Sequence, residues 1–227
     1  MNLQPRALQR LLWAQSALND ADFKLESASA DASFRSYWRG TSAGETWIVM
    51  DAPPDKEDTG PWLAMTKRLT DAGLNAPMIK AVDAEQGFVM MSDLGTRLML
   101  PELNEYSVDG LYGQAMHALL QMQTQLQSND LPVYNEVRLV AEMELMPTWF
   151  LERHLGFTPS CEQWDVIEVA FRCLSNQAEQ QTQVFVHRDY HSRNLMLLPD
   201  NSLGIIDFQD AAFGPLTYDL VSLLRDC

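Results

Sequence analysis

The sequence has few cysteines and lacks the cysteine patterns that bind metal ions. Its three cysteines, Cys161, Cys173 and Cys227, cannot all pair within one chain and form no CxxC or Cys/His motif. Long apolar runs are also missing, since no stretch approaches about 18 uncharged apolar residues and the first residues show no signal-peptide pattern. We therefore expect reduced thiols, a cytoplasmic protein and no membrane partner.

Positive charge is scarce as well. The chain has 16 Lys and Arg against 31 Asp and Glu, which gives a formal net charge of −15. This balance argues against a nucleic acid or an anionic membrane as the main partner. Only 11 Gly and 11 Pro occur in 227 residues, so a disordered or collagen-like chain is excluded, and the 46% hydrophobic content suffices for a core. The length fits one large domain or two lobes.

The first 93 residues are predicted to form a sheet with helices. A helical repeat of leucines occupies the first 20 residues, and three short β-type runs at 23–27, 34–40 and 46–50 predict an antiparallel meander. Residues 61–73 favour a helix that stops at a glycine, and residues 78–94 favour a hairpin that runs out into a loop.

After residue 93 the pattern changes from strands to helices. Helices are predicted over residues 107–127, 134–155 and 161–181, followed by strands near 184–187, 195–198 and 204–207 and a last helix from about residue 215. No fixed repeat appears. The fold class is therefore predicted as α+β, with an N-terminal lobe of residues 1–93 and a helical C-terminal lobe of residues 94–227.

Residues 187–194 read His-Arg-Asp-Tyr-His-Ser-Arg-Asn and follow an apolar run, which is the spacing of a kinase catalytic loop. Phosphoryl transfer to an alcohol needs a carboxylate near the hydroxyl and oxygen ligands for Mg²⁺. Asp189 fits the first role and Asn194 the second. Asp207, at the end of the next strand pair, would be a second metal ligand.

A purely structural interpretation is the alternative. In that case His187 and Asp189 stabilise a turn, Asn194 caps it and Asp207 ends a strand. The order and spacing of the set around a strand hairpin favour the catalytic interpretation. We assign no role to His191, and we interpret the methionine-rich runs as core fillers.

The chain resembles the aminoglycoside phosphotransferase and choline kinase superfamily in the segments VHRDYHSRNLML and GIIDFQDAAFGPLTYDLVSLLRD. The resemblance implies a protein-kinase-like fold in which a small sheet lobe holds ATP against a helical lobe. It also implies that Asp189 is the catalytic base, that Asn194 and Asp207 bind Mg²⁺, and that Asp219 supports the catalytic loop, as does His187. By the same pattern, the backbone near Met91 and Asp93 would hydrogen-bond adenine.

A narrower resemblance is to the bacterial anomeric kinases of N-acetylmuramate and N-acetylglucosamine. It rests on residues 31–35 (Asp-Ala-Ser-Phe-Arg), on residues 50–54 (Met-Asp-Ala-Pro-Pro) and on the C-terminal segment from residue 207. It implies transfer of the ATP γ-phosphate to the C1 hydroxyl of an amino sugar, in cytoplasmic recycling of the cell wall. An anomeric hydroxyl is more acidic than other alcohols, so an aspartate base is sufficient.

The chain departs from the superfamily in two respects. The third strand, residues 46–51, has no lysine to hold the nucleotide phosphates, and the candidates to replace it are Arg35, Lys56 and Lys67, with Arg35 the first choice and Lys56 the second. Relatives also continue beyond the helix that follows Asp219, so we expect Cys227 to be a truncation point in the C-terminal lobe.

Two other functions are open at this stage. A kinase of an aminoglycoside, choline or another amino alcohol would suit the negative charge, and a non-catalytic nucleotide-binding fragment would suit the missing lysine. We expect a small-molecule substrate, and the sequence gives no oligomeric state.

Overall fold

The computed structural model describes residues 5–30, 34–128 and 130–226. The chain forms two compact units, one of residues 1–118 with 192–209 and one of residues 119–191 with 210–227. These units are defined by packing and not by which residues bind a nucleotide. The lobe boundary between residues 93 and 94 therefore stays a prediction.

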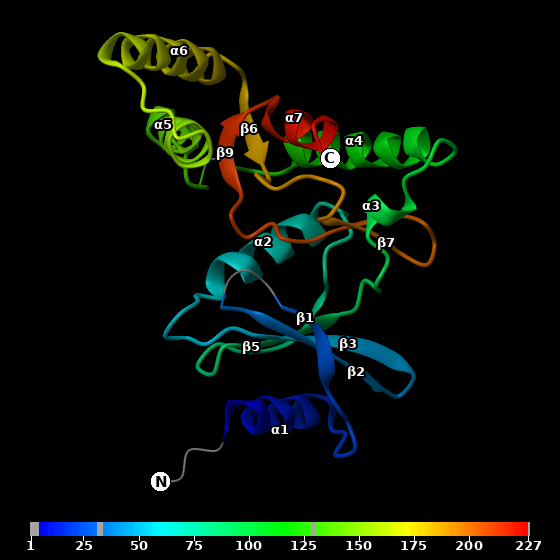
Figure 1. Cartoon of the computed structure of the whole chain (residues 1–227). Helices are drawn as coiled ribbons and strands as arrows, with labels where there is room; N and C mark the ends of the chain where they lie inside the picture. Colours follow the sequence, from blue (N-terminus) through cyan, green and yellow to red (C-terminus); the bar gives the residue numbers. More distant parts are fainter. Residues whose placement is uncertain (1–4, 31–33, 129, 227) are drawn as a thin grey trace. The chain divides into compact units, whose positions relative to one another are not determined.

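The first unit contains a five-stranded antiparallel sheet with the strand order β1-β2-β3-β5-β4 (Figure 1). Its strands are β1 (Glu26–Ala30), β2 (Ser36–Ser42), β3 (Glu45–Asp51), β4 (Ile79–Asp83) and β5 (Phe88–Ser92). The predicted meander and hairpin are confirmed. Residues 31–33, which carry part of the narrower resemblance, lie outside the described residues.

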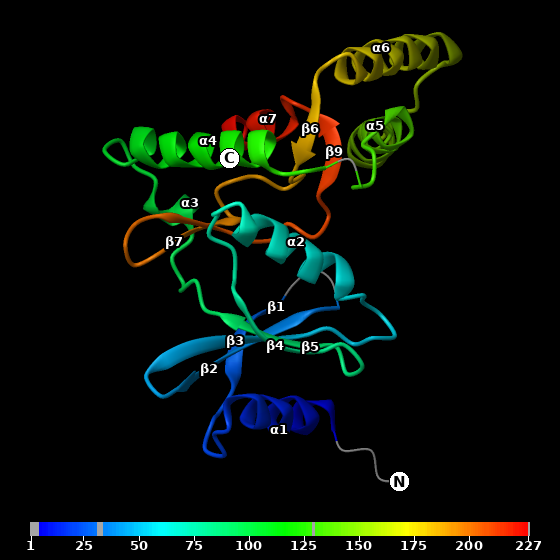
Figure 2. The same cartoon turned by 180° about the vertical axis from the view of Figure 1, so that it is seen from behind.

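Two helices cover opposite faces of this sheet, α1 (Arg6–Leu18) and α2 (Gly60–Asp71) (Figures 1 and 2). Side chains alternate between the faces of a strand. Val49 and Met90 therefore pack with Ala14 of α1 and with Phe23 in a fully buried cluster. This alternation also sends Asp51, two residues after Val49, toward α1.

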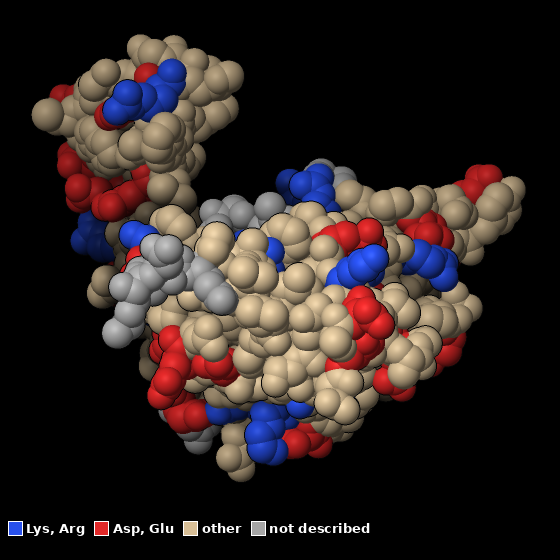
Figure 3. Space-filling view, turned by 90° about the horizontal axis from the view of Figure 1, so that it is seen from below, with Lys and Arg blue, Asp and Glu red and all other residues tan. Residues whose placement is uncertain are grey.

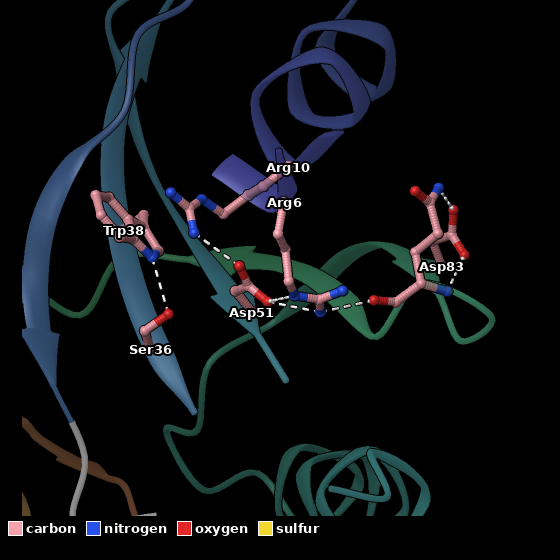
Figure 4. A network of polar contacts seen from close by, with 7 residues as sticks. Arg6, Arg10, Ser36, Trp38, Asp51 and Asp83 are labelled. Atoms are coloured by element: carbon pink, nitrogen blue, oxygen red, sulfur yellow. Dashed lines mark hydrogen bonds and ion pairs between the residues drawn. The ribbon is translucent and has the colours of Figure 1, made fainter. Parts of the chain in front are cut away.

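The carboxylate of Asp51 is buried and is held by two arginines of α1 (Figure 4). Arg6 Nε and Arg10 Nη1 each donate a hydrogen bond of 2.7 Å to it, and the Arg10 guanidinium lies 3.6 Å from the centre of the Trp38 ring. Arg6 also donates to the Gln86 carbonyl at 2.8 Å. Because a buried charge is tolerated only when it is paired, α1 is tied to the end of β3.

The first unit also contains α3 (Met99–Glu102) and a short hairpin of β7 (Leu195–Leu197) and β8 (Leu203–Ile205). Helix α4 (Val108–Gln125) contains the point at which the chain passes to the second unit. The predicted helix over 107–127 is therefore confirmed, whereas α3 was not predicted because it is only one turn long.

The second unit contains helices and a pair of antiparallel strands. It contains α5 (Glu136–Met143), the π-helix η1 (Met146–His154), α6 (Cys161–Glu179), β6 (Gln183–Val186), β9 (Ala212–Pro215) and α7 (Tyr218–Leu224). Strand β6 pairs with β9, which was not predicted. The single helix predicted over 134–155 is wrong: Pro147 lacks a backbone N–H, and a new helical segment starts around it.

Surface features agree with the composition. Cys161 and Cys173 are free and exposed, and Cys227 lies outside the described residues. Across the described part of the chain, every helix is too short or too polar to cross a membrane. The face shown in Figure 3 carries Lys and Arg in small separate groups among acidic and uncharged residues.

The Asp51 network predicts a stability difference. Arg10→Met should lower the free energy of unfolding by about 3 kcal/mol, because it leaves a buried carboxylate with one arginine in place of two. Urea unfolding measures this loss. Lys67→Met is the control, because it removes an exposed pair with Asp71 and should cause no measurable loss. Equal losses from both substitutions would contradict the importance of the network.

Candidate active site

The hairpin of β7 and β8 brings Asn194 and Asp207 together. Asn194 precedes β7 and Asp207 follows β8, and the pairing of Leu195 with Ile205 places the two residues at the same end of the hairpin. The Ile206 N–H donates to the Asn194 carbonyl at 3.1 Å, and Asn194 Nδ2 lies 3.4 Å from Asp207 Oδ2. An amide group and a carboxylate side by side can supply oxygen ligands for Mg²⁺, which takes one or two protein ligands beside substrate phosphates.

This hairpin is anchored within the first unit. Its backbone N–H groups at Ile205 and Leu197 donate to the carbonyls of Asn75 and Arg97, each at 2.7 Å. Phe208, next to Asp207, is fully buried, with its ring centre 5.5 Å from that of Trp62 in α2. The position of Asp207 is thus fixed on both sides.

The backbone of Asp207 is strained, with φ at 65°. An aspartate in the left-handed region costs free energy, and such residues cluster at functional sites. Its carboxylate lies 4.0 Å from the guanidinium of Arg35, whose side chain is only 9% exposed. That distance is to Oδ1, and the same oxygen accepts a hydrogen bond from Gln209 Nε2 at 3.0 Å. The structure therefore brings the first-choice phosphate ligand beside the second predicted metal ligand.

The other predicted nucleotide-binding residues are also in the first unit. Lys56 is exposed, 4.0 Å from Asp55 and 5.6 Å from the ring centre of Phe34, the residue before Arg35. Met91 is buried in β5 and is paired with both neighbouring strands. Asp93 is the first residue beyond β5, and its side chain forms an ion pair with Arg39. These placements do not test the predicted roles, which stay predictions.

Residues 187–191 of the predicted catalytic loop belong to the second unit. Asp189 is exposed, three residues after the end of β6, whereas His187 is fully buried. The buried carboxylate of Asp219 accepts the N–H of His187 at 2.6 Å and the N–H of Arg188 at 3.0 Å. His187 Nδ1 accepts the N–H of Asp189 at 3.3 Å. Asp219 and His187 thus shape the backbone that presents Asp189.

Burial changes the ionisation of Asp219. Loss of solvation raises the pKa of its carboxyl to about 7, with a further increase from the negative charge of Asp189. The two backbone N–H groups act in the opposite direction, because they stabilise the charged form. The contribution of Asp219 to the free energy of unfolding therefore depends on pH near neutrality.

A polar cluster beside the catalytic loop was not predicted. Arg188, with φ at 79°, donates to Glu142 of α5 at 2.9 Å. The hydroxyl groups of Tyr134 and Tyr218 also donate to Glu142, and burial raises the pKa of both tyrosines. The sequence pattern could not predict these contacts, because Glu142 and Arg188 are 46 positions apart.

Comparison with known proteins places the chain in a family. The sequence pattern of the phosphotransferase enzyme family matches residues 24–227. The chain belongs to this family, as the sequence predicted. Helix α1 lies outside the matched region.

Three relatives are N-acetylmuramate/N-acetylglucosamine kinases. The kinase of Pseudomonas putida is 39% identical, with 97% of this chain and 68% of the relative covered. That of Pseudomonas aeruginosa is 42% identical, with 88% and 59% covered, and that of Neisseria meningitidis is 39% identical, with 94% and 65% covered. The chain thus spans 59% to 68% of the lengths of these relatives.

Solved structures show the same fold at lower identity. The ADP-bound aminoglycoside phosphotransferase APH(2'')-Ib has a TM-score of 0.67 at 19% identity, with 96% of this chain and 76% of that chain covered. Choline kinase LicA from Streptococcus pneumoniae has a TM-score of 0.67 at 14% identity, with 97% and 74% covered. The predicted family and the α+β, kinase-like fold class are confirmed.

The pKa of Asp219 predicts a pH dependence of stability. Its ordinary value is 3.8 and its folded value is about 7, so folding takes up a proton between these values. The free energy of unfolding therefore receives a contribution that falls as the pH rises from about 4 to about 7. Asp219→Asn should remove this fall, so chemical unfolding across this range should show a flatter pH profile.

The matched control is Asp200→Asn. Hydrogen bonds from Ser202 lower the pKa of exposed Asp200 below its ordinary 3.8, so this residue titrates below the range in which Asp219 titrates, and its loss should leave the fall toward pH 7 unchanged. A constant penalty from the asparagine amide would shift the whole Asp219→Asn profile without changing its slope. An unchanged slope in Asp219→Asn would contradict the raised pKa.

Proposed function

We propose that the chain is the ATP- and Mg²⁺-dependent part of a kinase that phosphorylates the anomeric hydroxyl of N-acetylmuramate or N-acetylglucosamine. The observation that supports this most directly is the grouping of Asn194, Asp207 and Arg35 in one unit, together with the exposed Asp189 on a loop shaped by Asp219. The names of relatives at 39% to 42% identity support the amino sugar as substrate.

In this proposal Asn194 and Asp207 hold Mg²⁺, which neutralises charge on the ATP phosphates when it is bound. Asp189 accepts the proton of the sugar C1 hydroxyl while the C1 oxygen forms a bond to the γ-phosphorus. The bond from that phosphorus to the bridging β,γ-oxygen breaks, and ADP leaves. The products are ADP and a sugar 1-phosphate, with the proton on Asp189.

Positive charge near the phosphates is proposed to come from Arg35. Strand β3 has no lysine, and Arg35 lies beside a proposed metal ligand with a largely buried side chain. A guanidinium can bind two phosphate oxygens at once. Lys56 is the second candidate, because it lies close to Phe34 but remains exposed.

A second candidate function is the phosphorylation of an aminoglycoside, choline or another cationic alcohol. The net charge of −15 favours it. Structures of such enzymes share only the fold with this chain, at 14% and 19% identity, so we prefer the amino sugar. The cytoplasmic location and the role in cell-wall recycling are part of the same proposal. A non-catalytic nucleotide-binding fragment is the third possibility.

The experiment measures ADP release with N-acetylmuramate, N-acetylglucosamine, choline and an aminoglycoside. We expect turnover of the amino sugars and a product whose phosphate is released by mild acid, because an anomeric phosphate is acid-labile. Asp189→Asn should lower turnover by a factor on the order of 10² to 10⁴ and leave MgATP binding intact. Turnover of cationic alcohols alone would favour the second function, and MgATP binding without turnover would favour the third.

The phosphate-binding proposal predicts different effects at two cations. Arg35→Ala should lower kcat/KM for ATP by a factor on the order of 30, or roughly 2 kcal/mol, because a charge-assisted contact is lost. Lys56→Ala should have a smaller effect, because its ammonium is exposed. Steady-state kinetics at varied ATP measures both. Unchanged kinetics in Arg35→Ala with a large loss in Lys56→Ala would move the phosphate site to the second loop.

A further inference from the structure

Arg39 of β2 ties the segment after β5 to the sheet. Its Nε donates to Asp93 Oδ2 at 2.6 Å, and its Nη2 donates to Asp93 Oδ1 at 2.9 Å. The same Nη2 donates to the Gly95 carbonyl at 2.8 Å, and the Gly95 N–H donates back to Asp93 Oδ1 at 2.9 Å. These four hydrogen bonds close a ring around residues 93–95, with Leu94 between the two fixed residues.

The ring is held by a shielded ion pair. The side chain of Asp93 is 5% exposed and that of Arg39 is 22% exposed. Burial alone would raise the pKa of Asp93, but the hydrogen bonds from Arg39 and Gly95 and the charge of Arg39 lower it below its ordinary value. The pKa of Arg39 is raised, mainly by its hydrogen bond to Asp93. Both groups therefore stay charged across the physiological pH range, and the pair is less screened than a surface pair.

Leu94 is fixed from the other direction by β8. A side-chain carbon placed on Gly204 would come within 3.0 Å of Leu94 Cδ1, so Leu94 packs directly over this glycine. Residues 93–95 are thus held on one side by Arg39 and on the other by the hairpin that positions Asn194 and Asp207. A shift of this segment requires breaking one of these contacts.

The placement of Arg39 relates it to the proposed phosphate ligand. Arg39 is paired in register with Ile48, one residue from Val49, and therefore lies on the sheet face opposite α1. Arg35 precedes it by four residues, which corresponds to about 13 Å along an extended chain and is comparable with the length of an extended nucleoside triphosphate. One arginine lies beside Asp207 and the other holds residues 93–95.

We propose that Arg39 is a positioning residue that fixes the backbone of residues 93–95 for binding the base of ATP. This inference rests on the proposed function and adds a residue to it. A backbone that reads the edge of a base by hydrogen bonds must be held within a fraction of an ångström, and a small displacement costs much of the affinity. A bidentate guanidinium supplies that rigidity, whereas a lysine can make only a point contact.

The test is nucleotide binding to the whole chain, measured by calorimetry in the presence of Mg²⁺. Arg39→Lys should weaken ATP binding on the order of tenfold, because the forked contact is lost while the charge remains. Binding of inorganic tripolyphosphate, which has no base, should stay within about twofold of the wild type. The unfolding midpoint of each variant is measured in parallel. In the Asp93→Asn background, Arg39→Lys should cause a smaller further loss than in the wild type, because only the contact of Arg39 with the Gly95 carbonyl then remains to be lost.

Arg97→Lys is the matched control. Arg97 makes an equivalent bidentate contact with Glu102, but this pair is exposed and lies outside the ring, so ATP binding should not change. If Arg39→Lys binds ATP with wild-type affinity, this inference is overturned and the proposed function is not. The same holds if Arg39→Lys loses equal affinity for ATP and for tripolyphosphate. A wild-type chain that binds no ATP would overturn the proposed function and this inference together.

Discussion

The backbone of the predicted catalytic loop depends on one buried carboxylate. Asp219 is shielded from water and accepts two successive backbone N–H groups, those of His187 and Arg188. A buried carboxylate without hydrogen-bond donors would cost several kcal/mol, so the loop is constrained to keep both N–H groups directed at it. Arg188, within this segment, has a positive φ of 79°. The exposed position of Asp189 therefore follows from the burial of a residue 30 positions later in the sequence.

The metal-binding and nucleotide-binding candidates follow from a different constraint, the register of short strands. Leu195 of β7 pairs with Ile205 of β8, so Asn194 and Asp207 lie at the same, open end of their hairpin. The hairpin in turn is fixed to Asn75 and packs under Leu94. The first unit thereby contains the proposed metal ligands and the proposed nucleotide contacts, whereas the proposed base belongs to the second unit.

Local sequence carried much of this information. Asp189, Asn194 and Asp207 could be selected because their spacing is set by one loop and one hairpin, and both are short-range features. The contacts of Arg39 with Asp93 and of Arg188 with Glu142 span 54 and 46 positions, and no periodicity encodes them. Tertiary pairing also explains why β9 was not predicted: three of its four residues, Ala212, Gly214 and Pro215, are poor strand formers, and the strand pairs with β6, which is distant in sequence.

Because the chain has few positive charges, the binding of an anionic ligand depends on where its arginines lie. Arg6 and Arg10 neutralise Asp51, and Arg39 neutralises Asp93, so these three arginines serve the sheet and the segment beside it. Arg35 differs, because the carboxylate 4.0 Å away is Asp207, itself a proposed metal ligand. A carboxylate that shares its charge with a metal ion attracts a neighbouring guanidinium less strongly, which leaves the guanidinium more available to phosphate oxygens. Under the proposed function, Arg35 would therefore provide positive charge for a triphosphate in an acidic chain without a lysine in β3.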